Sequence, residues 1–387
     1  MKELLEREHE LAAVEELLGR RSGNLAIEVG VGLGKTSLVQ AACRRAQELD
    51  YQVLSARGSE LEADFAFGVV RQLFERRLAG AEADERASLL VGPAAAAGPL
   101  LLGRSVEVSA GDTSFAVLHG LYWLAANLSA ARPLLLAVDD AHWADQPSLR
   151  WLTYLARRLD GLMLVLLVTL RPSDPSIANA TLLALRAEAP TILRPALLSE
   201  RAVSALVRTT MDGRSSDGLC EAIWTASGGN PLYVTELLRA VELNDRHLAE
   251  LDPAELLVSG LEGIGRRVIA RVRRLDPVAL RLAQALAVLG DGCELRHAAA
   301  TAGLEMIDAT KLAAGLVRLE VLADDDPPRF IHPVVRDALE VSLGGDARDA
   351  AHRSACQSAS NFDPPSAFKM ALMAFIVDMG RIRSLQR

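Results

Sequence analysis

Residues 25–40 contain the side chains whose types and spacing point most clearly to a chemistry, in the order L-A-I-E-V-G-V-G-L-G-K-T-S-L-V-Q. An apolar run is followed by three glycines at alternate positions, then by Lys35-Thr36 and a stretch with the pattern of a first helical turn. Glycines let backbone N–H groups turn toward an anion, and the N-terminus of a helix adds partial positive charge. The stretch therefore predicts a phosphate-binding loop, in which Lys35 bridges the β- and γ-phosphates of a nucleotide and the Thr36 hydroxyl binds Mg²⁺.

Val29 departs from the usual spacing of such a loop, G-x-x-x-x-G-K-[ST], which has a glycine at that position. A β-branched residue does not easily take a positive φ, so a loop that needs one there would bind nucleotide more weakly, and Val29→Gly would tighten binding. The alternative is a glycine-rich turn that merely precedes Lys-Thr, in a protein-interaction module that hydrolyses nothing. The remaining candidates for cofactor binding in the loop are Gly30, Gly32, Gly34 and Ser37.

Two acidic residues, Asp139 and Asp140, follow the continuous apolar run 134–138. Such a run is typical of a strand in a parallel sheet that is buried on both faces. A carboxylate at the end of this strand can hold Mg²⁺ through water, and a second acid can orient the attacking water. We therefore assign Asp139 to the metal and Asp140 to catalysis. Taken alone, the pair is equally explained as a helix cap or a loop acid.

Arg171 comes directly after the next predicted buried strand, 163–169. By itself it is an ordinary surface arginine, but at a strand end it could reach a γ-phosphate and report its presence. His142 and Trp143 lie close to the acidic pair in sequence, although a tryptophan is more often a packing residue. His332 is a lone histidine in F-I-H-P, and its position alone favours a structural role.

The elements that must position these residues are buried strands that alternate with helical segments. This alternation predicts the α/β class, with a doubly wound parallel sheet whose ligands bind at the carboxyl ends of the strands. Lys35, Asp139 and Arg171 all lie just past such ends. The strands are predicted at 25–29, 52–56, 134–138 and 163–169.

The length of 387 residues suggests two or three domains. Beyond the α/β part the strand signal fades into helices, and a short extended pair at 321–323 and 329–331 suggests a winged helix. The expected domains are a nucleotide-binding α/β domain at 1–196, a helical domain at 197–260, a winged-helix-like domain at 261–345 and a divergent tail at 346–387.

Composition places the protein among soluble proteins. The net charge of −8 gives no overall attraction to nucleic acid or to a membrane of anionic lipid. Four widely spaced cysteines suit a reducing compartment, and the charged N-terminus does not resemble a signal peptide. The longest apolar run, 162–170, is shorter than the roughly 20 residues that span a bilayer. We therefore expect a cytoplasmic protein.

Six motifs occur in a fixed order and together resemble a known family. They are E-R-E-H-E-L, G-L-G-K-T, V-D-D-A-H-W-A-D-Q-P-S-L, T-L-R-P, S-G-G-N-P-L-Y-V-T-E-L-L and R-F-I-H-P-V-V-R-D-A-L. Over about residues 1–345 the chain resembles the ATPase half of the large LuxR-type regulators of actinobacteria (the LAL class), within the STAND class of signalling NTPases. The resemblance implies a P-loop NTPase domain of AAA-like type and a switch between ATP and ADP.

The resemblance also implies roles for individual residues. Lys35 and Thr36 match the Walker A residues for phosphate and Mg²⁺, Asp139 with Asp140 match the Walker B acids, and Arg171 matches the sensor arginine.

The resemblance implies roles for three further residues, which do not lie at the ends of strands. The segment around Arg7 would lie near the adenine, Pro231 would pack on the base, and His332 would sense the β-phosphate. ADP would hold the helical and winged-helix domains closed, and ATP exchange would open them for self-association or for a partner regulatory protein.

The chain departs from the family pattern at Val29, at Glu6, which replaces the usual glycine before Arg7, and at its end. Such regulators continue to a C-terminal helix-turn-helix, whereas this chain stops at Arg387, so we expect no DNA-reading domain in it. ATP hydrolysis would be slow and regulatory. A DNA-acting AAA-type ATPase that uses the winged helix on DNA remains an alternative, which the acidic balance disfavours.

Overall fold

The protein is described by a computed structural model, which covers residues 4–30, 32–59, 62–103, 112–171, 180–211, 215–243, 265–290 and 293–343. The chain divides into two compact units, Met1–Ala196 and Leu197–Arg387. The tail expected at 346–387 lies outside the described residues.

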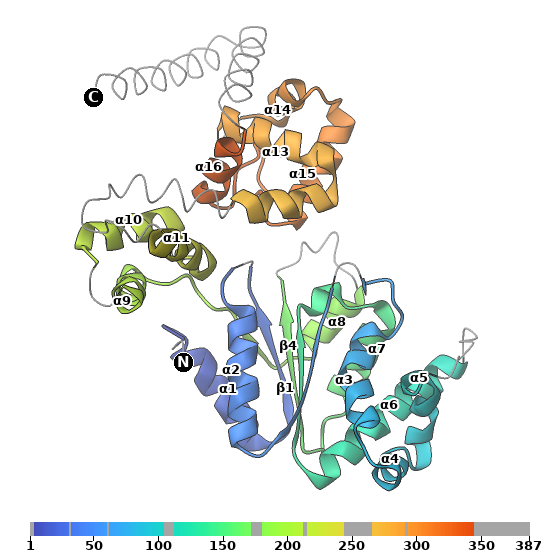
Figure 1. Cartoon of the computed structure of the whole chain (residues 1–387). Coiled ribbons are helices and arrows are strands. Elements are labelled where there is room, and N and C mark those ends of the chain that lie inside the picture. Colours follow the sequence, from blue (N-terminus) through green and yellow to red (C-terminus); the bar gives the residue numbers. More distant parts are fainter. Residues whose placement is uncertain are drawn as a thin grey trace, which may run out of the picture. The chain divides into compact units, whose positions relative to one another are not determined.

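The first unit is built on a five-stranded sheet in the order β2-β3-β4-β1-β5 (Figure 1). All of its neighbouring strands pair in parallel. The predicted α/β class with a doubly wound parallel sheet is therefore confirmed. The strands are β1 (Gly23–Glu28), β2 (Gln52–Arg57), β3 (Leu134–Asp139), β4 (Leu164–Leu170) and β5 (Thr191–Leu193).

Helices cover both faces of this sheet, and the period of two along each strand divides the buried side chains between them. On β1, Leu25 and Ile27 pack in one core with α1 and α2, whereas Ala26 packs in the other with α3, α6, α7 and α8. Both faces of the central strands are thus apolar, as their continuous apolar runs predicted. The helices are α1 (Glu8–Arg20), α2 (Lys35–Glu48), α3 (Gly68–Ala79), α6 (Asp112–Ala131), α7 (Gln146–Ala156) and α8 (Ala180–Ala187).

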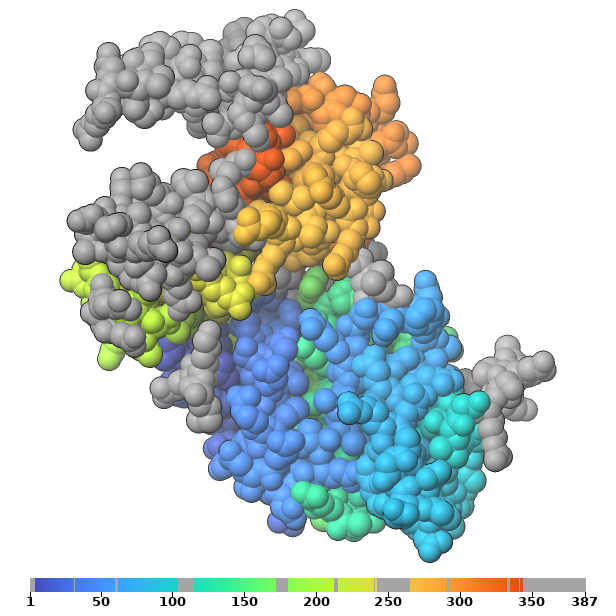
Figure 2. Space-filling model, viewed as in Figure 1, coloured from blue at the N-terminus to red at the C-terminus, as the bar shows by residue number. Residues whose placement is uncertain are grey.

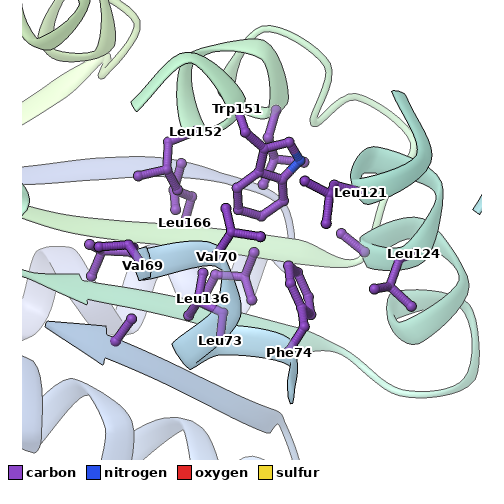
Figure 3. Close-up of a cluster of buried hydrophobic side chains, with 14 of the residues drawn as sticks. Val69, Val70, Leu73, Phe74, Leu121, Leu124, Leu136, Trp151, Leu152 and Leu166 are labelled. Carbon is purple, nitrogen blue, oxygen red and sulfur yellow. The ribbon is translucent and has the colours of Figure 1, made fainter. Parts of the chain in front are cut away.

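The core formed with α3, α6, α7 and α8 contains two aromatic side chains that pack on each other. Phe74 of α3 meets Trp151 of α7 edge to face, with ring centroids 5.4 Å apart, and both are fully buried. Figure 3 shows the two rings next to Leu136 and Leu166 from the central strands. This packing holds α3 and α7 against the sheet.

The alanine-rich residues 92–97 form a 3₁₀ helix. A Cβ atom on Gly120 of α6 would lie 2.9 Å from the backbone nitrogen of Ala97, so α6 packs closely on this helix only because glycine stands there. The short elements between α3 and α6 are α4 (Ala83–Leu89), η2 (Gly92–Ala97) and α5 (Gly98–Leu101).

The second unit is helical. Its helices are α9 (Glu200–Thr210), α10 (Asp217–Ser227), α11 (Pro231–Leu243), a helix at 265–275, α13 (Pro277–Leu289), α14 (Leu295–Ala302), α15 (Met306–Arg318) and α16 (Pro333–Val341). The two extended segments expected near residue 325 pair through one antiparallel bridge, Leu322 to Phe330. Whether this part is a winged helix stays a prediction.

None of the helices in the described parts of the chain combines the length and apolar character that crossing a bilayer requires. Cys43, Cys220 and Cys293 are free thiols. Figure 2 shows that residues from the first quarter of the chain, in blue, form much of the surface of the first unit on the viewed side.

Candidate functional site

The glycine loop runs from the end of β1 to the start of α2. Gly32 and Gly34 have φ values of +83° and +92°, a conformation that glycine adopts without strain. Gly34 is also the N-cap of α2, which begins at Lys35. Two of the three glycines are therefore required by the backbone, and the loop delivers the N-terminus of α2 to the end of the sheet.

Val29 does not occupy a position that needs glycine. Its φ is not positive. Its backbone N–H donates to the Leu170 carbonyl at 3.2 Å, and this hydrogen bond continues the pairing of β1 with β4. Its side chain is 5% exposed and packs in the core with α2. The weakened binding expected for this residue depended on a positive φ, and that condition is not met.

Lys35 is folded into the loop. Its side chain is buried, and Nζ donates to the carbonyl oxygens of Val29 at 2.6 Å and Gly30 at 3.0 Å. The positive charge therefore lies inside the turn formed by the glycines, where an anion would approach.

Asp139 connects the glycine loop with two central strands. Its Oδ2 accepts a hydrogen bond from the Thr36 hydroxyl at 2.7 Å, and its Oδ1 accepts from the Thr169 hydroxyl of β4 at 2.7 Å. Thr36 and Asp139 are 103 residues apart in sequence and meet because parallel strands end at the same edge. A hydroxyl and a carboxylate side by side are oxygen ligands of the type that Mg²⁺ prefers.

Asp140 is held by a residue that the sequence analysis missed. Arg57, the last residue of β2, donates from Nε at 3.1 Å and Nη2 at 2.8 Å to Oδ2 of Asp140. The backbone of Asp140 has a φ of +50°, and a Cβ atom on Gly58 would lie 2.3 Å from its carbonyl oxygen. Gly58 therefore allows the end of β2 to approach the acidic pair. The available signal was the position of Arg57 at a strand end, the same signal that identified Arg171.

His142 follows the acidic pair in the chain and belongs to the short 3₁₀ helix η3 (Ala141–Trp143). Its Nε2 is 4.0 Å from Oδ1 of Asp140, and its side chain is 11% exposed. Burial, with the nearby charges of Arg171, Lys35 and Arg57, lowers the pKa of His142 to about 2, so the imidazole is neutral. Neither ring nitrogen has a hydrogen-bond partner among the described residues.

Arg171 is the residue directly after β4, and its Cζ lies 6.0 Å from the centre of the Trp143 ring. The positive charge of Arg171 lowers the pKa of His142, as do those of Lys35 and Arg57. The three cations therefore lie near the same imidazole. Ser37, in contrast, is exposed on the first turn of α2.

Arg7 is buried and fixes the start of the chain to the end of the first unit. Its Nη2 donates to the Ala196 carbonyl at 2.7 Å, and its Nη1 donates to the Glu6 carbonyl at 2.8 Å. Glu6 has a φ of +54°, so the glycine usual at this position has a conformational reason. The proximity of Arg7 to an adenine stays a prediction.

Pro231 and His332 both belong to the second unit. Pro231 begins α11 after the G-G-N turn, and His332 packs on that turn, because a Cβ atom on Gly228 would lie 2.3 Å from its Nε2. The His332 ring centre is 5.1 Å from that of Tyr233, and burial lowers its pKa despite a hydrogen bond with the Ser227 backbone. The roles of Pro231 and His332 toward a nucleotide stay predictions.

Glu28, the last residue of β1, is a second acid that the sequence analysis missed. Its Oε2 is 3.0 Å from Nη2 of Arg186 and 2.8 Å from Nη2 of Arg194. The Arg186 guanidinium, with that of Arg194, lowers the pKa of Glu28 against the opposing effect of burial. This cluster ties β1 to α8 and to the segment after β5.

Comparison with known proteins agrees with this geometry. Residues 3–168 match a protein family described as the AAA ATPase domain. This part of the chain is therefore an AAA-type P-loop ATPase domain. A search of curated proteins finds no match.

Solved structures with the same fold include a Walker-type ATPase of Pyrococcus abyssi, with a TM-score of 0.55, 14% identity and coverage of 87% of this chain and 96% of that one. The ORC2 protein of Aeropyrum pernix, in its ADPNP–ADP complexes, has a TM-score of 0.51 and 15% identity, covering 91% of this chain and 95% of its own. A STAND protein of Pyrococcus horikoshii with a tetratricopeptide repeat sensor has a TM-score of 0.39 and 14% identity, with coverage of 99% and 50%. The first two likenesses show the fold alone.

Proposed function

We propose that the protein is an ATP/ADP-binding signalling switch of the STAND type, the nucleotide-binding portion of a LuxR-like transcriptional regulator, with slow ATP hydrolysis at most. The observation that carries this proposal is the 2.7 Å hydrogen bond between Thr36 and Asp139. It joins the glycine loop to the acidic strand end, and a nucleotide with Mg²⁺ needs both parts at one place.

The residues of the first unit fit a nucleotide and Mg²⁺. The Thr36 hydroxyl and the Asp139 carboxylate supply oxygen ligands for the metal. Lys35 can exchange the carbonyl oxygens of Val29 and Gly30 for phosphate oxygens without leaving the loop. The unpartnered ring nitrogens of His142, within the part of the chain that the structure describes, leave a donor for a phosphate oxygen or a water.

Mg²⁺, when bound, neutralises the charge that develops on the β- and γ-phosphate oxygens. Lys35 would bind the same phosphates from the loop, and Asp139 would hold the metal. Asp140 would orient the attacking water, and Arg171 would report the γ-phosphate from the end of β4.

The slow rate follows from the state of Asp140. Both of its hydrogen bonds from Arg57 go to one carboxylate oxygen, so the lone pairs of that oxygen are engaged and do not accept a hydrogen bond from the attacking water. The site therefore favours retention of bound nucleotide over rapid turnover, as a switch requires.

The switch would act through the second unit. We propose that ADP stabilises a closed arrangement to which Pro231 and His332 contribute, and that ATP exchange frees the protein for self-association or for a partner regulatory protein. The packing of His332 on the Gly228 turn supports the idea that these two segments act together.

The test is the identity of the nucleotide that the purified protein carries. We expect acid-released material to contain ADP or ATP at close to one equivalent, with release accelerated by removal of Mg²⁺. Protein that carries no nucleotide, and that binds neither ATP nor ADP after purification, would instead support the non-hydrolysing interaction module.

A second candidate function is a DNA-acting ATPase, because the helix at 265–275 carries an exposed basic face. Its exposed arginines are Arg266, Arg267, Arg273 and Arg274. A duplex-DNA shift by the full chain that weakens steeply with salt, and that disappears when these four arginines become glutamine, would favour this candidate. The absence of any shift at low salt would exclude it.

A further inference from the structure

A cavity of about 460 Å³ lies in the first unit between α2, β2 and α3. Successive turns of α2 form one wall, with Gln40, Arg44 and Gln47, and the edge strand β2 forms the opposite wall. Val39 and Ala56 are buried and contribute the apolar floor. The volume is within the range of small-molecule sites, about 300–1,000 Å³. The cavity is open to solvent, because most of its polar lining side chains, including Arg44 and Arg57, are exposed.

The cavity adjoins the metal-binding residues but differs from the phosphate loop. Thr36 and Asp139 close one end of it, whereas neither Lys35 nor any loop glycine lines it. A ligand here would therefore lie beside a bound nucleotide rather than replace its phosphates.

The lining carries two positive side chains and one negative side chain, together with neutral amide and hydroxyl groups. Two guanidinium groups, from Arg44 and Arg57, face a single carboxylate, that of Asp139, which already accepts bonds from Thr36 and Thr169. Burial raises the pKa of the Cys43 thiol in the wall, so the thiol stays protonated and does not add a negative charge to the lining. The described residues also contain no cluster of three metal-binding side chains.

Two adjacent arginines of α2 differ in whether an acidic side chain compensates their charge. Arg45 lies outside the lining and pairs with Glu15 and Glu48, each at 2.9 Å. Arg44 lines the cavity and has no ion pair or hydrogen bond with any residue that the structure describes. Its charge is therefore available to a ligand.

Arg57 supplies the second anchor. It uses Nε and Nη2 on Asp140, and a guanidinium has five N–H donors, so it can bind a second anion at the same time. We propose that this cavity binds a small organic anion, with a carboxylate or phosphate group held between Arg44 and Arg57, next to the nucleotide.

The same geometry couples the anion to the nucleotide site, and this part rests on the proposed function. An anion on Arg57 competes with Asp140 for its charge, which frees the carboxylate to orient water. ATP hydrolysis should therefore rise about twofold to fivefold at saturating anion, the size expected for a partly exposed ion pair.

Succinate and inorganic phosphate serve as probes, one for each anion type. Saturation-transfer proton NMR detects the binding of succinate, and broadening of the ³¹P resonance detects the binding of phosphate. The protein is saturated with Mg²⁺ and ADP so that the phosphate loop is filled, and sodium chloride matches the ionic strength. We expect saturable binding of at least one probe, about fivefold weaker in Arg44→Gln and unchanged in Arg45→Gln. Equal weakening in both variants, or no saturable binding of either probe, would overturn the proposal.

A repeat with Lys35→Ala protein and no nucleotide separates the two proposals. Anion binding that keeps its dependence on Arg44 supports the cavity even if the nucleotide site is misassigned. If Arg44→Gln does not weaken anion binding in either protein, the wild type with ADP or the Lys35→Ala protein without nucleotide, the cavity proposal is refuted. The nucleotide proposal is not affected by that result, because it depends on the ATP affinity of the wild type. Thermal unfolding of Arg44→Gln and Arg45→Gln checks that both variants are folded.

Discussion

The ends of β1 and β3 each present a buried acid, yet their surroundings differ in kind. Glu28 at the end of β1 is enclosed by Arg186 and Arg194, two permanent cations of the fold. Asp139 at the end of β3 accepts hydrogen bonds from the neutral hydroxyls of Thr36 and Thr169, and a cation, Nε of the exposed Arg57, is no closer than 4.0 Å to its Oδ2. Burial alone therefore does not mark a functional acid, and the type of partner separates a structural acid from one that can bind a ligand.

The largest expected effect is on the β3 side. Asp139→Asn should weaken Mg²⁺-dependent nucleotide binding by about 100-fold, because an amide cannot supply the negative charge that holds the metal. Titration calorimetry with and without Mg²⁺ measures this. Unchanged affinity in Mg²⁺ would show that Asp139 is as structural as Glu28.

Glu28→Gln should lower the free energy of unfolding by about 2–3 kcal/mol, because two arginines lose their buried partner, although both can turn partly toward solvent. Nucleotide affinity of the folded variant should not change. Glu48→Gln, which removes an exposed partner of Arg45, is the control and should cost about 0.5 kcal/mol or less. A Glu28→Gln variant of normal stability but poor affinity would reverse the comparison.

The pH dependence of stability tests the same acid. The pKa of Glu28 is lowered in the folded protein, so its contribution is fully present above the unfolded pKa, near 4.5, and is lost as pH falls through the folded value. Wild type should therefore lose more stability than Glu28→Gln between neutral pH and pH values below 4.5. Parallel urea-unfolding curves across this range would contradict the assignment.

Val29→Gly should lower the free energy of unfolding by about 2 kcal/mol, because it removes a buried side chain and adds backbone entropy to the unfolded chain. Nucleotide affinity should stay the same, since the residue needs no positive φ. Tighter binding by the variant would restore the original interpretation that the missing glycine weakens the loop.

The smallest expected effect is on turnover. Arg57→Gln should raise the rate of ATP hydrolysis about twofold to fivefold, because it removes two charged hydrogen bonds from Asp140. A coupled phosphate-release assay measures the rate, and Arg45→Gln is a matched control on the same unit. A lower rate would show that Arg57 assists the reaction instead of restraining it.

The sequence predicted those features that depend on local pattern. Continuous apolar runs identified the central strands, and the rule for parallel strand ends predicted that the glycine loop and Asp139 meet at one edge of the sheet. Motif patterns, in contrast, could not show that Glu6 has a positive φ and that Val29 does not.

Features that depend on distant partners were missed. Glu28 meets Arg186 and Arg194 across 158 and 166 residues, so nothing near it in sequence indicates its charge partners. β5 was missed because it has only three residues, with little apolar pattern. Arg57 was missed because its importance comes from the close approach of β2 to Asp140, which Gly58 permits.

The central claim is that Lys35, Thr36 and Asp139 form one site for a nucleotide with Mg²⁺. Titration calorimetry of nucleotide-free protein with ATP and Mg²⁺ tests it most directly, with Lys35→Ala as the variant and the exposed Lys311→Ala as its control. We predict that Lys35→Ala abolishes measurable binding while Lys311→Ala binds like the wild type. Equal ATP affinity in the wild type and Lys35→Ala would contradict the account.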